Sequence, residues 1–148
     1  MQQTRVIYLE IPRPPIERAA CFAAARLVEQ GQRVVVHAAD EQQARALDEM
    51  LWSFDPDSFV AHCRVEAGPV DENSAESVVV AAGEASWPAA TAVVLAAPAS
   101  AEWCEGFSTV VDFAVKYDPE LLQASRARFR AWRDRGFDPE YRDRGGRR

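Results

Sequence analysis

The sequence predicts an α/β fold of three layers, in which helices flank a mostly parallel sheet. Runs of β-branched residues alternate along the chain with helix-like stretches, which is typical of strands joined by helical crossovers. One run, Arg33–Ala38, is a short apolar segment of the kind that is buried on both faces of a parallel sheet. A chain of 148 residues that is 48% hydrophobic has room for one core. We therefore expect a single domain over residues 1–137.

The first half of the chain predicts two strand-and-helix units. Arg5–Ile11 is rich in β-branched and aromatic residues and ends at a group of prolines, which indicates a strand followed by a turn. The Ala-rich run Ile16–Gln30 favours a helix, because its apolar residues recur at helical spacing and a glycine follows it. After the strand Arg33–Ala38, Asp40 is placed to cap a helix over Glu41–Trp52, with a glutamine completing a capping box.

The middle of the chain predicts two further strands. Residues between Cys63 and Asn73 are mostly polar and indicate a loop. Ser77–Ala81 and Ala92–Ala97 are short apolar runs typical of strands, and the turn-forming stretch Gly83–Pro88 separates them.

The last part of the chain predicts one more strand and the longest helix. Ala101–Phe107 favours a short helix, and Thr109–Val115 a strand. Asp118 precedes a proline that suits the first helical turn, so a helix begins there and runs to about Arg135. Residues 138–148 are charged and contain glycine, so we expect a basic, flexible C-terminal tail.

Charge is distributed unevenly along the chain, whose formal net charge is −6. Residues 124–148 hold nine Arg against four Asp or Glu, a balance of +5, which leaves 8 basic against 19 acidic residues, or −11, over residues 1–123. An acidic body repels a phosphate backbone, so contact with nucleic acid is expected to be mainly indirect. No apolar stretch approaches the roughly 18 residues of a membrane span, and no signal core follows the start, so we expect a cytoplasmic protein.

Glycine, lysine and cysteine give little support to catalysis or cofactor binding. None of the seven glycines falls in a phosphate-binding motif, and Lys116 is the single lysine. The cysteines, Cys21, Cys63 and Cys104, are far apart, with only two histidines to help them hold a metal. We therefore expect no enzymatic activity, no cofactor and no metal. The alternative is a flavodoxin-like protein or enzyme that binds a nucleotide or small ligand at the strand ends, near Asp40.

Polar residues near the predicted strands have structural interpretations. Asp40 serves equally well as a helix cap. His37 lies within a β-branched run and is expected to be a hydrogen-bonded core or edge histidine. His62 and Cys63 are adjacent, so on a strand their side chains would point to opposite faces and would not form a nucleophile–base pair.

The last predicted helix carries the strongest functional signal. At about 100° per residue, one narrow arc forms an apolar stripe, made of Leu121, Leu122, Ser125, Phe129 and Trp132. A row of arginines borders this stripe at Arg126, Arg130 and Arg133. On the opposite flank we expect two solvated arginines, Arg128 and Arg135.

Two interpretations of the arginine row remain open. It is either a solvated helix face whose cations suit the helix dipole, or a site for an anionic ligand. Like charges along one row of a helix repel one another, which favours the second interpretation. Guanidinium groups bind carboxylates with two hydrogen bonds, and Phe129 and Val115 would form an apolar floor beside them. A short acidic peptide with a hydrophobic end would satisfy both parts.

Three segments together resemble the chi subunit of the bacterial DNA polymerase III holoenzyme. They are Arg33–Glu49, Leu47–His62 (LDEMLWSFDPDSFVAH) and Val110–Phe137 (VVDFAVKYDPELLQASRARFRAWRDRGF). The combination of L-D-E-x-L-W with a distant V-V-D-F and an Arg-rich helix ending in G-F is far more specific than any one piece. The resemblance implies a noncatalytic accessory protein with a nucleotide-binding-like fold that holds no nucleotide.

The resemblance also implies two partner surfaces. In this family chi binds the acidic C-terminal tail of the single-stranded DNA-binding protein and joins the psi subunit of the clamp-loader complex. Carried over by position, the tail-binding residues are Val115, Arg126, Phe129 and Arg130. A separate surface, with Trp52 and Phe59, would bind psi or a helicase.

Some positions depart from the family pattern. Phe129 stands where the family commonly has Tyr, which keeps the apolar wall and loses a hydroxyl. One extra residue near Ala114 leaves either Val115 or Ala114 to face the pocket. On their pattern alone, Trp52 and Phe59 are equally typical of packing at the rim of a core.

Overall fold

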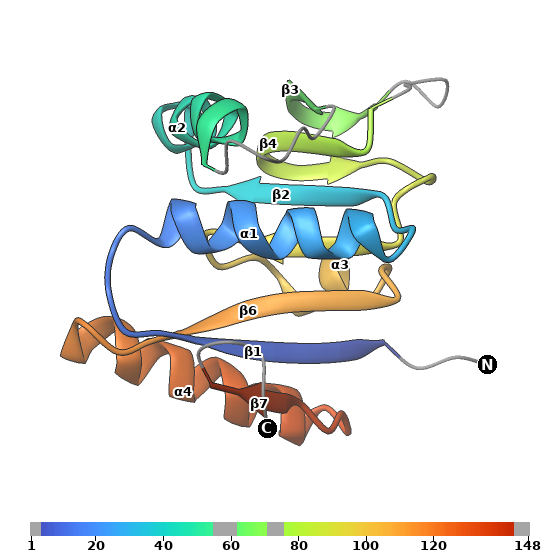
Figure 1. The fold of residues 1–148 in the computed structure, drawn as a ribbon. Coiled ribbons are helices and arrows are strands. Elements are labelled where there is room, and N and C mark those ends of the chain that lie inside the picture. Colours follow the sequence, from blue (N-terminus) through green and yellow to red (C-terminus); the bar gives the residue numbers. More distant parts are fainter. Residues whose placement is uncertain (1–3, 55–61, 71–75, 144–148) are drawn as a thin grey trace.

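The structure is a computed structural model, and it describes residues 4–54, 62–70 and 76–143. Within these ranges one sheet contains seven strands, and each pairing is parallel. The strands are β1 (Arg5–Ile11), β2 (Val34–Ala38), β3 (His62–Pro69), β4 (Val78–Ser86), β5 (Ala92–Leu95), β6 (Thr109–Val115) and β7 (Glu140–Arg142). The helices are α1 (Ile16–Glu29), α2 (Glu41–Ser53), α3 (Ala101–Cys104) and α4 (Pro119–Asp134). The strand order is β3-β4-β2-β5-β6-β1-β7 (Figure 1).

Helices cover both faces of this sheet, with α1 and α4 on opposite sides (Figure 1). One core joins apolar residues of α1 and α2 to the strand side chains that face them, including Val111, Phe113 and Val115 of β6. The other core joins α3 and α4 to the remaining strand side chains, including Val110 of β6. Neighbouring residues of β6 thus go to opposite faces, as in any β-strand. The predicted three-layer α/β fold is confirmed.

The β3 region corrects one prediction. The stretch Cys63–Asn73 was expected to be a loop, yet β3 covers His62–Pro69. β3 pairs only with β4 and lies at the edge of the sheet. An edge strand is covered on fewer sides than a central one, so it accepts the polar residues that otherwise indicate a loop. The predicted turn at Gly83–Pro88 also begins too early, because β4 continues through Gly83 (φ +112°) to Ser86.

The C-terminal segment corrects a second prediction. Residues 138–148 were expected to form a flexible tail, but Glu140–Arg142 form β7, which extends the sheet beyond β1. Residues 144–148 lie outside the described ranges. Because β7 has three residues and two of them are charged, it carries no hydrophobic periodicity by which a strand is recognised.

Ion pairs as well as backbone pairing hold β7 against β1. The Glu140 carboxylate accepts hydrogen bonds from Arg5 Nε (2.6 Å) and Arg5 Nη2 (3.1 Å), and from Arg142 Nη2 at 3.1 Å. The hydrogen bond from Arg5 is the largest cause that lowers the pKa of Glu140. The ionised carboxylate therefore stabilises the docked strand.

We expect β7 to loosen in acid. Since the pKa of Glu140 is lower in the folded chain, its contribution is complete above the ordinary glutamate pKa and is lost as the pH falls through the lowered pKa. Amide exchange protection of the β7 N–H groups that bond to β1, measured by NMR against intrinsic rates, should fall over this range. In Glu140→Gln the protection should already be low at neutral pH and change little. The same pH dependence in both proteins would contradict this role.

Candidate functional site

α4 is placed by strong helix-end signals and by one buried serine. The Asp118 carboxylate accepts hydrogen bonds from the backbone N–H groups of Glu120 (2.9 Å) and Leu121 (3.2 Å), which caps the helix as predicted. Deeper in the helix, the buried Ser125 hydroxyl accepts a hydrogen bond from Val115 N–H (3.3 Å) and lies 2.9 Å from the Phe113 carbonyl oxygen. This serine fastens the helix to the end of β6.

The arginines of α4 divide into two groups by their partners. Arg128 binds the Asp112 carboxylate through two hydrogen bonds, from Nε (2.8 Å) and Nη2 (3.1 Å). Arg135 Nε donates to Glu105 at 2.8 Å. Arg128 was expected to be solvated, and that prediction is wrong, because its partner Asp112 is buried in β6 and spacing within one helix does not reveal it. Arg135 is exposed as expected, although it also pairs with Glu105.

The second group of arginines, Arg126, Arg130 and Arg133, lies on the other flank of α4. Among the residues that the structure describes, Arg126 and Arg130 make no ion pair with the protein's own acids. Arg133 stacks its guanidinium over the Phe129 ring, 5.1 Å from the centroid. Cationic groups of this kind are available for an anion from outside the chain.

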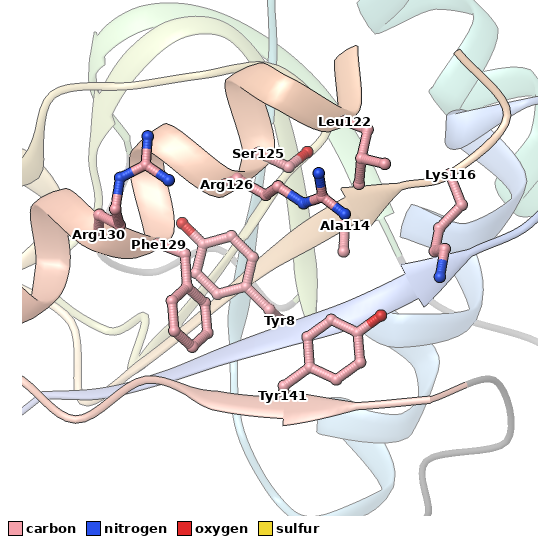
Figure 2. Close-up of a pocket in the computed structure, with 9 residues that line it drawn as sticks. All are labelled: Tyr8, Ala114, Lys116, Leu122, Ser125, Arg126, Phe129, Arg130 and Tyr141. Carbon is pink, nitrogen blue, oxygen red and sulfur yellow. The ribbon is translucent and has the colours of Figure 1, made fainter. Parts of the chain in front are cut away.

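A cavity of about 340 Å³ lies beside these arginines. Its lining comes from α4, β1, β6 with the residue that follows it, and β7, namely Tyr8, Ala114, Lys116, Leu122, Ser125, Arg126, Phe129, Arg130 and Tyr141. Figure 2 shows the α4 side chains on one side, Tyr141 on the other, and Tyr8 with Ala114 between them. Three predicted site residues, Arg126, Phe129 and Arg130, are therefore brought together at one cavity.

Val115 is not part of this cavity. It is 4% exposed and belongs to the core on the opposite face of the sheet, packed with α1 and α2. Ala114 takes its place, because adjacent residues of β6 face opposite sides. Leu121, predicted in the apolar stripe of α4, is also misplaced, since its side chain is 46% exposed.

Sequence reasoning missed three residues of the cavity. Lys116 follows β6 directly, and its Nζ lies 3.6 Å from a Glu10 carboxylate oxygen. Tyr8 forms the floor because β1 is the neighbour of β6, a pairing that the sequence does not specify. Tyr141 comes from β7, which was not predicted. Lys116 had a local signal, as the single lysine directly after a predicted strand.

Tyr8 gives the cavity an apolar floor. Its ring meets the Phe129 ring edge-on, with centroids 5.1 Å apart. Burial raises the pKa of the Tyr8 hydroxyl, and the negative charge of Asp112 raises it further, so the group stays neutral. The cavity thus combines aromatic and aliphatic surface with three cations at its rim, which suits an anionic group attached to an apolar one.

The turn after β1, where α/β folds usually bind the phosphates of a nucleotide, lacks the groups that such a site needs. In such folds phosphate binds backbone N–H groups at the turn after β1 and at the start of α1. Here that turn contains Pro12, Pro14 and Pro15, which have no N–H to donate. Glu17 in the first turn of α1 adds a negative charge that repels phosphate.

The carboxyl ends of β2 and β5 are also filled by the chain itself. Gln43 Nε2 donates to Glu17 Oε2 (3.0 Å) and to the Ala96 carbonyl (3.2 Å), and Gln43 Oε1 accepts from Ala39 N–H (2.8 Å). Asp40 accepts a hydrogen bond from Gln43 N–H (2.8 Å), which confirms its interpretation as a helix cap. The alternative of a nucleotide site near Asp40 finds no support in this arrangement.

The histidine and the cysteines singled out in the sequence have contacts that indicate structural roles. His37 is buried, and its ring nitrogens lie 3.0 Å and 3.2 Å from the carbonyl oxygens of Gly83 and Pro98, as expected for a hydrogen-bonded core histidine. Cys21 and Cys104 are buried, and burial raises the pKa of each thiol to about 12.

In the described ranges, no group of three His, Cys, Asp or Glu side chains is arranged to hold a metal ion. No helix in these ranges has the length and apolarity to cross a membrane.

The second predicted surface is described only in part. Trp52 on α2 is 62% exposed, and its ring centroid lies 4.8 Å from that of His62. Phe59 lies outside the described residues. α2 packs on the sheet face opposite to α4, so Trp52 is well separated from the arginine row (Figure 1).

The fold and the cavity define a nucleotide-binding-like α/β protein that presents a cationic, aromatic pocket on its last helix. A model of the family described as DNA polymerase III chi subunit, HolC, matches residues 1–140. The DNA polymerase III subunit chi of Escherichia coli K12 is 33% identical over 129 residues, covering 83% of this chain and 82% of that protein. The subunit chi of Pseudomonas aeruginosa PAO1 is 31% identical over 137 residues, covering 90% and 92%. The chain belongs to the DNA polymerase III chi subunit family.

A more distant likeness concerns the fold alone. The structure of Saccharomyces cerevisiae Dbp5 bound to RNA and ADP BeF3 superposes with a TM-score of 0.65 at 11% identity. The match covers 97% of this chain and 42% of that chain. The two proteins thus share a nucleotide-binding-like α/β architecture.

We expect the Asp112–Arg128 pair to dominate the stability of this region. Arg128→Ala should lower the free energy of unfolding by about 3 to 5 kcal/mol, because the buried Asp112 carboxylate would lose its cation. Arg126→Ala, on the same helix, should change it by less than about 0.5 kcal/mol. Urea denaturation of both variants checks this. Similar small losses in the two would show that the pair does not fix α4.

Proposed function

We propose that this chain is a noncatalytic accessory subunit of the DNA polymerase III clamp-loader complex that binds the acidic C-terminal tail of the single-stranded DNA-binding protein. Membership of the chi family supports the polymerase assignment. The observation that carries the tail-binding proposal is the cavity beside α4, where Arg126 and Arg130 stand next to the Phe129 wall without an ion pair among the described residues.

The chemistry of the cavity supports one mode of binding. The terminal carboxylate of the tail, or an Asp near it, would accept hydrogen bonds from Arg126, with Arg130 and Lys116 adding attraction. The aromatic end of the tail would pack against Phe129 and Ala114. Ala114 replaces Val115 in this proposal, because Val115 faces the other core.

Affinity for such a peptide is expected to be modest. Ordering a disordered tail offsets much of the contact energy, so a Kd on the order of micromolar is expected. Several tails on one partner would raise the effective strength. Weak single contacts of this kind suit a link between the polymerase and coated template that must form and release repeatedly.

The exposed Trp52 supports a second proposal, that α2 and the segment with Phe59 bind psi or a helicase. A large aromatic side chain that is 62% exposed is a typical anchor of a protein interface. This surface is separate from the α4 cavity, so both partners could be bound together.

We also propose that the protein acts in the cytoplasm and requires no cofactor.

Tail binding is tested by calorimetry with a synthetic acidic peptide that ends in an aromatic residue. Arg126→Ala should weaken binding by about 1.5 to 3 kcal/mol, the range for a lost charge-assisted hydrogen bond, and affinity should fall as salt rises. Arg135→Ala is the matched control, because Arg135 binds Glu105 and lies away from the cavity. No heat with the unaltered protein, or equal affinity in the Arg126 variant, would remove the assignment.

The second surface is tested by capture of psi or a helicase from the same organism. Trp52→Ala should reduce capture of either partner, because truncating an exposed anchor typically costs about 2 kcal/mol or more. Arg126→Ala should leave that capture unchanged while it reduces capture of the single-stranded DNA-binding protein. Loss of both partners in the same variant would argue against two separate surfaces.

A further inference from the structure

The far wall of the α4 cavity is built by the last strand of the sheet. β7 pairs with β1 so that Tyr141 lies directly beside Tyr8. Partners in register point to the same face of a sheet, so both rings face α4. Glu140 and Arg142 face the other side, where Glu140 binds Arg5. The ion pairs that dock β7 therefore also present Tyr141 to the cavity.

Tyr141 is held in place by a second contact. Its hydroxyl donates a hydrogen bond to Glu10 Oε1 at 3.0 Å, and the other oxygen of Glu10 lies 3.6 Å from Lys116 Nζ. Burial raises the pKa of Tyr141, and Glu10 raises it further, so the hydroxyl keeps the proton that it donates. Tyr141 is 38% exposed and lines the cavity, so a ligand in the cavity can reach it.

We propose that Tyr141 determines the specificity of this cavity and that Glu10 is its positioning residue, so that together they select a peptide whose last side chain is aromatic. The proposal rests on the proposed function of the cavity as a peptide site. Tyr141 lies just beyond residues 1–140, which match the chi family. The family match therefore does not include Tyr141.

The placement of charge supports a defined orientation of the peptide. Figure 2 shows Tyr141 across the cavity from Arg126, with Ala114 between them. An aromatic side chain entering there would meet Tyr141 on one side and Phe129 and Tyr8 on the other. The Glu10 carboxylate lies outside the cavity lining but beside Tyr141, where its charge repels a second carboxylate and so directs the peptide's terminal carboxylate toward Arg126.

The test compares two short Asp-rich peptides that differ only in their last residue, Phe or Ala. Selectivity is the ratio of their Kd values, measured by calorimetry on the full chain. Tyr141→Ala should reduce this ratio by about 3- to 10-fold, the value of one aromatic contact. Glu10→Ala should reduce it by a smaller factor, and Glu10→Gln should restore it, since the Gln amide oxygen still accepts the Tyr141 hydrogen bond.

The ratio separates specificity from general effects. Removing the Glu10 charge would change the affinity for both acidic peptides alike, whereas only a displaced Tyr141 ring changes their ratio. Tyr141→Phe keeps the ring and loses the hydroxyl, so it should resemble Glu10→Ala and decides the matter if Tyr141→Ala fails to fold.

The outcomes distinguish this inference from the proposed function. If the unaltered protein binds neither peptide and Arg126→Ala changes nothing, the assignment of the cavity as a peptide site is wrong, and the inference about Tyr141 is overturned with it. If the protein binds and Arg126→Ala weakens both peptides, but the Tyr141 and Glu10 variants keep the original ratio, only the assignment of Tyr141 and Glu10 is overturned.

Discussion

The site depends on the buried ion pair between Asp112 and Arg128. A carboxylate that is 2% exposed needs a cation at fixed geometry, and Arg128 supplies it with two hydrogen bonds. This fixes the rotation of α4 about its own axis. At about 100° per residue, Arg126 and Arg130 lie ~40° from each other and ~160° from Arg128, so pinning Arg128 to β6 turns the other two toward the cavity.

The usual nucleotide site of this fold has unfavourable chemistry for phosphate in this chain. A turn with Pro12, Pro14 and Pro15 cannot offer the N–H groups that phosphate requires, and Gln43 with Glu17 fills the neighbouring strand ends. The likeness to Dbp5 therefore extends to architecture alone. The candidate site has moved to α4 and the strands beneath it, which illustrates that function belongs to sites rather than folds.

Features that lie within one element could be predicted from the sequence, and those that join distant elements could not. β6 matches its predicted bounds because Thr109, Val110, Val111, Phe113 and Val115 all favour a strand. Helical spacing places Arg126 and Arg130 in one row beside Phe129, and the family resemblance singles these three out as site residues. The partner of Arg128 lies in a different element, and Tyr141 belongs to a strand of three residues held by charges. Neither has a periodic signal, so only the folded chain reveals them.

The division of the cavity between α4 and β7 affects how such a surface can diverge. β7 is a short edge strand outside both apolar cores, so replacing it disturbs little of the interior. Substitutions after residue 137 can therefore retune recognition while the arginines stay unchanged.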